Sequence, residues 1–232
     1  MIYPIEWPTV DGVRFAPAQM TCELAFKSRS GGLTINGSEQ VVGTRGERWE
    51  ASMTLPAMSP PRVVAWQGFL AQMRGRVGSV LMPAFPVNRP PYVRDAFGRQ
   101  ITPDMFRGIP GVAGGRFAVR PGPGAQIVVT VSGAFAAGST QIVLNLVSVG
   151  EIAVGHRFSI GPRLYSILSI ARDGGRITVE IAPPLRKAVQ DGDAAEFLNP
   201  VCQMKFATDN EGVLQMDYAR IARPTVNFVE AY

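Results

Sequence analysis

Histidine and cysteine are scarce in this chain. Its 232 residues include a single histidine, His156, and two cysteines, Cys22 and Cys202. Two cysteines cannot build a zinc or iron–sulfur site without further ligands. Both cysteines fall at apolar positions of predicted strands, so we expect them to be reduced core residues. His156 comes just before a predicted strand, where a turn histidine is expected rather than a catalytic base.

Charged side chains are also few. They make up 18% of the residues, against roughly 25% in ordinary soluble domains, which indicates a surface that partners cover. Of the 23 basic residues, 20 are arginine, a residue that suits interfaces with carboxylates. These arginines are scattered singly, so the net charge of +5 does not form the run of like charges that nucleic-acid binding favours. We expect no specific nucleic-acid partner.

A long apolar run that could cross a membrane is missing. Residues 121–150 contain no charged side chain, but Gly133, Gly138 and Asn145 interrupt them, and a spanning helix needs about 20 mostly apolar residues. Two strands and a turn explain this stretch better. Residues 1–8 contain Glu6 and two prolines, which predicts no secretory signal. We expect no membrane insertion.

The usual combinations of catalytic or ligand-binding residues are not found either. Glu47 and Glu50 lie on one predicted strand with Arg48 between them, so they are interpreted as surface charges rather than a glycosidase pair. Asp191-Gly192-Asp193 lacks the further oxygens of a calcium loop and is predicted to be a turn. Trp7, Trp49 and Trp66 could form a sugar-stacking platform, but Trp49 and Trp66 fall on predicted core faces. The sequence therefore predicts no enzyme, no metal and no cofactor.

Glycine and proline are abundant, with 25 and 19 residues respectively. Together they make up about a fifth of the chain, against roughly 12% in ordinary proteins. This composition favours many short strands joined by tight turns.

The first third of the chain predicts strands, a hairpin and one helix. Apolar residues alternate with polar ones over 20–27, from Met20 to Phe26, and again over 47–55, as in strands with one buried face. Asn36-Gly37 predicts a hairpin turn. Ser59 and Pro60 predict the start of a helix over 60–74, with Val63, Trp66, Leu70 and Met73 on its apolar face. The helix should stop at Gly75, and residues 77–83 read as a buried strand.

The remaining sequence predicts an inserted domain. Residues 84–120 are rich in proline and glycine and read as an arm that reaches a neighbour. Six short strands are expected within 125–199, at 126–131, 141–146, 157–160, 164–170, 176–181 and 194–198. Amphipathic strands then return around Met204, Leu214 to Tyr218, and Val226. The predicted fold is mainly β: a β-sandwich or barrel with one packed helix, formed by 1–120 and 200–232, carries an inserted small all-β barrel or sandwich over 125–199.

Two parts of the sequence carry a family resemblance. Residues 46–53 hold Arg48-Trp49 on a strand, and they are followed by the helix segment 66–73 and by Arg74-Gly75-Arg76-Val77-Gly78-Ser79 with Leu81-Met82-Pro83. This order resembles tail proteins of long-tailed bacteriophages, in which a strand with Arg-Trp precedes a helix and an Arg-Gly-Arg segment that ends in Leu-Pro. In this chain Met73 and Val80 stand at the first and last variable apolar places of that segment. Residues 154–160, 181–186 and 192–193 also look like phage tail proteins, with His156 in place of the usual aspartate.

The closest family implied is the distal tail protein. The resemblance implies a tube-like β-sandwich with a packed helix, assembly as a hexameric ring, and a place in the virion at the tail tip, made in the host cytoplasm. It implies contacts with the tail tube protein and the tip hub protein, and with tail fibres or a host surface glycan through residues 125–199.

Six arginines are candidates for the assembly interface. Two of them flank Gly75, the predicted hinge after the helix, and four lie in the predicted arm over 84–120; the six are Arg74, Arg76, Arg89, Arg94, Arg99 and Arg107. Two other functions stay open at this point. One is a receptor- or glycan-binding tail module built on 125–199, and the less favoured one is a cell-wall hydrolase.

Overall fold

A computed structural model describes residues 4–33, 35–85, 90–94, 127–214 and 223–232. It divides the chain into two compact units. Unit 1 consists of residues 1–84 and 201–232, and unit 2 of residues 85–200. The mainly β class with one packed helix is confirmed for the part of the chain that the structure describes. None of the helices in that part is both long enough and apolar enough to cross a membrane.

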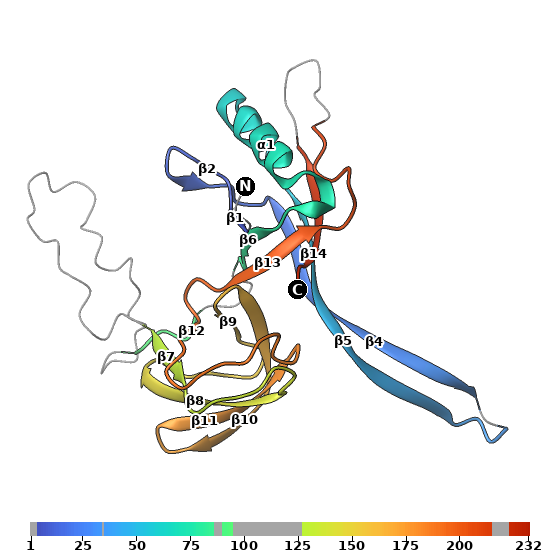
Figure 1. Cartoon of the computed structure of the whole chain (residues 1–232), viewed down its shortest axis with the longest axis vertical. Helices are drawn as coiled ribbons and strands as arrows, with labels where there is room; N and C mark the ends of the chain where they lie inside the picture. Colours follow the sequence, from blue (N-terminus) through green and yellow to red (C-terminus); the bar gives the residue numbers. More distant parts are fainter. Residues whose placement is uncertain (1–3, 34, 86–89, 95–126, 215–222) are drawn as a thin grey trace, which may run out of the picture. The chain divides into compact units, whose positions relative to one another are not determined.

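Unit 1 is built on one six-stranded sheet (Figure 1). Its order is β1-β6-β13-β14-β5-β4; the strands are β1 (Ile5–Glu6), β4 (Gln19–Leu33), β5 (Glu39–Thr54), β6 (Val80–Pro83), β13 (Val201–Phe206) and β14 (Thr225–Glu230). All neighbours are antiparallel except β1 and β6. A small ribbon of β2 (Thr9–Val10) and β3 (Val13–Arg14) turns at Asp11-Gly12, where both residues have positive φ.

One helix covers a face of this sheet, and aromatic rings fill the space between them. Helix α1 (Pro60–Met73) buries Val63, Trp66, Phe69 and Met73. The Trp66 indole N–H donates to the Gly212 carbonyl at 2.9 Å, and Phe69 meets Phe206 edge to face at 6.0 Å. The predicted alternation on β5 is confirmed, because Trp49, Ala51, Met53 and Leu55 are all buried. Trp7 is buried as well, with its indole donating to Phe15.

Three details of the helix differ from the prediction. Phe69 takes the fully buried position, whereas Leu70 is only partly buried. Ser59 is the N-cap residue but makes no side-chain capping bond. Pro60 and Pro61 occupy the first two helical positions, and Pro61 has no N–H, so one of the two usual donors to an N-cap side chain is missing. The helix ends at Met73, before the predicted Gly75.

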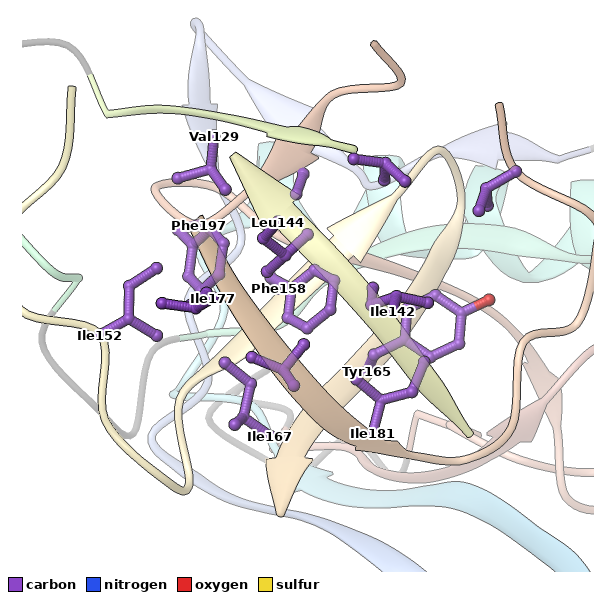
Figure 2. Close-up of a cluster of buried hydrophobic side chains, with 14 of the residues drawn as sticks. Val129, Ile142, Leu144, Ile152, Phe158, Tyr165, Ile167, Ile177, Ile181 and Phe197 are labelled. Atoms are coloured by element: carbon purple, nitrogen blue, oxygen red, sulfur yellow. The ribbon is translucent and has the colours of Figure 1, made fainter. Parts of the chain in front are cut away.

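Unit 2 is a nearly closed barrel of six short strands in the order β12-β9-β10-β11-β8-β7. The strands are β7 (Val128–Val131), β8 (Gln141–Ser148), β9 (Arg157–Ile160), β10 (Arg163–Asp173), β11 (Arg176–Ala182) and β12 (Ala195–Glu196). An isolated bridge between Thr130 and Ala194 links the two ends of the order. Figure 2 shows the core, where Phe158 and Phe197 stack at 5.0 Å. Each of the six predicted strands has its counterpart here.

Other expectations fall partly on residues outside the described ranges. The predicted arm over 84–120 lies mostly in 86–89 and 95–126, and residues 85–94 group with unit 2. The boundaries 1–120 with 200–232, and 125–199, stay predictions. The strand expected from Leu214 to Tyr218 lies outside the described residues beyond Leu214, which itself is in no strand. Cys22 and Cys202 are both buried, and neither is in a disulfide, as expected.

Candidate functional site

The Arg-Gly-Arg segment after α1 is a tight, backbone-fastened turn. Arg74 takes a left-handed conformation, with φ 50° and ψ 49°, and its N–H donates to the Leu70 carbonyl at 3.3 Å. Gly75 follows with φ 64°, and the Arg76 N–H donates to the Asp209 carboxylate at 3.1 Å. The last carbonyls of the helix are therefore capped by backbone N–H groups, those of Arg74 and Gly78.

Gly78 closes this turn and is the glycine that the packing requires. Its N–H donates to the Met73 carbonyl at 2.8 Å. A Cβ at this position would lie 2.4 Å from that carbonyl oxygen, although the φ of −76° is open to any residue. The sequence indicated Gly75 as the glycine that ends the helix. Within this turn, however, an added Cβ would come closest to the backbone at Gly78.

The candidate interface arginines fall on both units. The side chains of Arg74 and Arg76 are exposed, and within the described residues neither guanidinium forms an ion pair. Arg94 is exposed and belongs to unit 2. Arg89, Arg99 and Arg107 lie outside the described residues. Arg74 and Arg76 are thus the two candidates that the structure brings together.

Sequence reasoning missed the largest exposed element, a long hairpin formed by β4 and β5. The strand predicted from Met20 and the hairpin predicted at Asn36-Gly37 are parts of one continuous pairing, from Gln19 opposite Thr54 to Leu33 opposite Glu39. Figure 1 shows these two strands leaving the rest of the sheet as a two-stranded ribbon. From here on we call residues 26–43 the arm; this hairpin is a different segment from the arm predicted over 84–120.

Every described side chain of the arm is exposed, on both faces of the ribbon. Phe26 is 65% exposed, against the prediction that it belongs to a buried face, and Val41 and Val42 are each 55% exposed. Phe26 sits where the pairing register shifts, between Ala25 and Lys27. This irregularity takes Phe26 out of the alternation that buries Cys22. The signal in the sequence was the loss of apolar residues on both faces after Phe26, over 27–32.

The arm lies beyond the point where β14 stops pairing with β5. β14 pairs with β5 from Thr225 opposite Thr54 to Val229 opposite Glu50. The next residue of β14, Glu230, is buried, and its carboxylate accepts the Trp49 N–H at 3.2 Å. Beyond this point β4 is the only described strand beside β5, so neither edge of the arm has a neighbouring strand among the described residues.

A groove of about 420 Å³ lies beside the base of the arm, across β4, β5 and β14. Its lining includes Glu23 and Glu50 but no basic residue. These two glutamates are directly opposite each other on β4 and β5, an arrangement of like charges that is unfavourable without a nearby cation. Arg48 pairs with Glu50 at 2.7 Å, whereas Glu23 forms no ion pair with any described residue. Glu23 is therefore the carboxylate of the groove that favours a positively charged occupant.

The described residues contain no group of three or more metal-ligating side chains. The carboxylates of Asp191 and Asp193 accept the N–H groups of Gly133 and Gln190, respectively. Asp193 therefore holds its own turn, and Asp191 links that turn to the distant Gly133. Within residues 127–199 the aromatic side chains belong to the core rather than to a stacking platform: Phe158, Tyr165 and Phe197 are buried, and Phe135 packs against the same cluster.

The His156 imidazole accepts a hydrogen bond within a turn, and its protonation should lower the stability of the fold. Its Nδ1 accepts the Ala153 N–H at 3.1 Å, and burial lowers the pKa of His156 below 6.5. The unfolded chain then binds the proton more readily, so the stability that the neutral imidazole contributes is present above pH 6.5 and is lost as the pH falls through the folded-state pKa. We expect a small fall in the unfolding temperature between pH 7.5 and 5.5, measured by calorimetry. His156→Asn, which keeps an acceptor for Ala153, should reduce this fall; an unchanged fall would contradict the assignment.

The sequence matches no protein-family model, and none of the curated proteins matches it.

Proposed function

We propose that this chain is a structural, non-enzymatic subunit of a phage tail tip. Copies of it form a closed ring, six in number as the sequence resemblance implies, that joins the tail tube protein to the tip hub protein and the fibres. The resemblance of residues 46–83 and 154–193 to phage tail proteins supports the role in a tail tip. The exposed arm supports the assembly of several copies.

The arm is the observation that carries this proposal. A two-stranded hairpin on its own is at best marginally stable in water, and unpaired strand edges are templates for another chain. Here every described side chain of residues 26–43 is exposed, including the apolar side chains of Phe26, Val41 and Val42. A neighbouring copy that covers the arm would stabilise the hairpin and would cover its unpaired strand edges. The subunit is therefore complete only within an assembly.

A head-to-tail contact fits this geometry. Such a contact joins two different patches of the same chain, and it closes into a ring when the rotation between copies allows it. The arm supplies one patch, and the acidic groove with Glu23 and Glu50 supplies a second of different character. Lys27 and Arg29 lie two residues apart on β4, and so on one face of the arm, where they can meet carboxylates of the next copy.

Replacing both Arg74 and Arg76 by alanine should weaken assembly more than folding. Both side chains are exposed, whereas the turn is held by backbone groups that alanine retains. We expect the double variant to dissociate at a subunit concentration about tenfold higher than the wild type, because two charge-assisted contacts are lost. Sedimentation velocity measures dissociation, and thermal unfolding of the dissociated subunit measures folding.

The matched control is Arg14→Ala with Arg223→Ala, which removes two exposed arginines of unit 1 away from the turn. An equal loss of assembly in this control, or an equal loss of monomer stability in the Arg74 and Arg76 variant, would contradict the role of the turn. Wild-type protein that stays a 25.0 kDa monomer at all concentrations and binds no tail component would overturn the proposed function itself.

A further inference from the structure

Unit 2 contains a second concave site that assembly does not explain. A cavity of about 310 Å³ lies between the β9–β10 turn and residues 187–194. Its volume is at the lower end of the range for small-molecule sites. Arg163, Tyr165, Lys187 and Asp193 are among the side chains that line it. The cavity lies entirely within the barrel unit.

The walls of this cavity are held in place by hydrogen bonds. Arg163 pairs with Ile160 across the two-residue turn Gly161-Pro162, where Gly161 has a φ of 56°. The Tyr165 hydroxyl accepts the Arg186 N–H at 3.1 Å and so fixes the residue next to Lys187. Figure 2 shows this hydroxyl directed away from the hydrophobic cluster.

The segment opposite the turn is fixed as well. Val189 exchanges two backbone hydrogen bonds with Phe135, each of 3.0 Å. The Asp193 carboxylate accepts the Gln190 N–H at 2.8 Å, within its own turn. The cavity is therefore largely preformed, which lowers the entropic cost of binding a ligand.

The charge of the lining selects the ligand. Arg163 is only 9% exposed, and a guanidinium that is shielded from water attracts a negatively charged ligand more strongly than one in solvent. Lys187 is exposed at the rim and forms no ion pair with any described residue. The two cations outnumber the single carboxylate of Asp193 in the lining. Arginine presents a planar fork that matches carboxylate and phosphate oxygens, while lysine adds a mobile point charge.

We infer that this cavity binds a small anion, a carboxylate or a phosphate, with Arg163 as the fork and Lys187 as the second positive group. The inference is independent of the ring, because every residue it uses belongs to the barrel unit. Its failure would leave the proposed function untouched.

Isothermal titration calorimetry of the full chain tests it, with inorganic phosphate, glucuronate and uncharged glucose as ligands at fixed ionic strength in chloride. We expect saturable binding of phosphate, glucuronate or both, and none of glucose. Phosphate alone indicates a phosphate or phosphodiester source, and glucuronate alone indicates an acidic sugar. The absence of saturation with both anions at 20 mM, about the weakest affinity of interest, overturns the inference.

The variants locate the site. Lys187→Ala changes an exposed residue and should weaken binding about fivefold, and Arg163→Lys, which keeps the charge but loses the fork, about tenfold. Arg176→Ala is the matched control, because Arg176 is an exposed arginine at the start of β11 and is absent from the lining. Equal weakening by Lys187→Ala and Arg176→Ala would show general attraction to a basic surface and would overturn the site.

Discussion

Shortening the arm should leave a folded subunit that no longer assembles. In the variant, residues 28–43 are removed and Lys27 is joined to Thr44 through Asn-Gly. Lys27 and Thr44 are opposite each other in the hairpin, and Asn-Gly forms the two-residue turn that antiparallel strands accept. We expect size-exclusion chromatography with light scattering to show a ring for the wild type and a single subunit for the variant.

We expect a large effect on assembly and a small one on folding, because the arm contributes little to the stability of the single subunit. None of its described side chains is buried, so its removal costs the core of unit 1 almost nothing. Far-UV circular dichroism and the unfolding temperature should therefore be nearly unchanged. In a ring the same residues supply strand edges and apolar surface to a neighbour, and this contact is lost in every subunit at once.

Point variants provide the control for the deletion. Phe26→Ser together with Val42→Thr keeps the length of the arm and removes exposed apolar side chains, so it should weaken the ring. Val64→Thr, at a valine 69% exposed on α1, should leave the ring intact. A shortened protein that still assembles would show that the arm is not the contact, and the proposed function would lose its main support.

Replacing Gly78 by alanine should destabilise unit 1 by about 3 kcal/mol. The added Cβ would lie 2.4 Å from the Met73 carbonyl oxygen and 2.8 Å from the Met73 Cα. Both atoms belong to the backbone at the end of α1, so the clash is not relieved by rotating a side chain. The turn must open, and the 2.8 Å bond from the Gly78 N–H to Met73 is lost.

Gly68 provides the opposite case in the same element. It lies within α1, and a Cβ there would meet nothing within 4 Å. Alanine is the better helix former, so Gly68→Ala should stabilise unit 1 by up to about 1 kcal/mol. Chemical denaturation of both variants gives the comparison. Destabilisation by both, or by neither, would contradict the packing described for Gly78.

Much of the fold could be predicted because its pattern is local. The alternation from Trp49 to Leu55 and the paired prolines before Val63 each specify one element within a few residues, and the structure has both. The six strands of the barrel were found for the same reason, since glycine turns such as Gly161-Pro162 separate them. Phe69 was missed because both it and Leu70 fit a helical stripe, and only the aromatic rings of the sheet decide between them.

The arm and the cavity could not be predicted, for a different reason. Local alternation shows that Phe26 belongs to a strand, but not that the sheet ends at Trp49 and leaves Phe26 uncovered. That depends on β14, which comes from the far end of the chain. Likewise, Arg163 and Lys187 are 24 positions apart, and only the closure of the barrel brings them to one cavity.

The strand order of unit 1 also sets the timing of folding during synthesis. β13 and β14 lie between β6 and β5, yet of these strands they are synthesised last, after all of unit 2. The barrel is contiguous in sequence and can fold while the chain is still being made, whereas the sheet of unit 1 must wait for residues 201–230. The arm is synthesised early, but the sheet that anchors it forms only after β13 and β14 have been made. A chain cut short before residue 201 would therefore lack two central strands of the sheet that holds the arm.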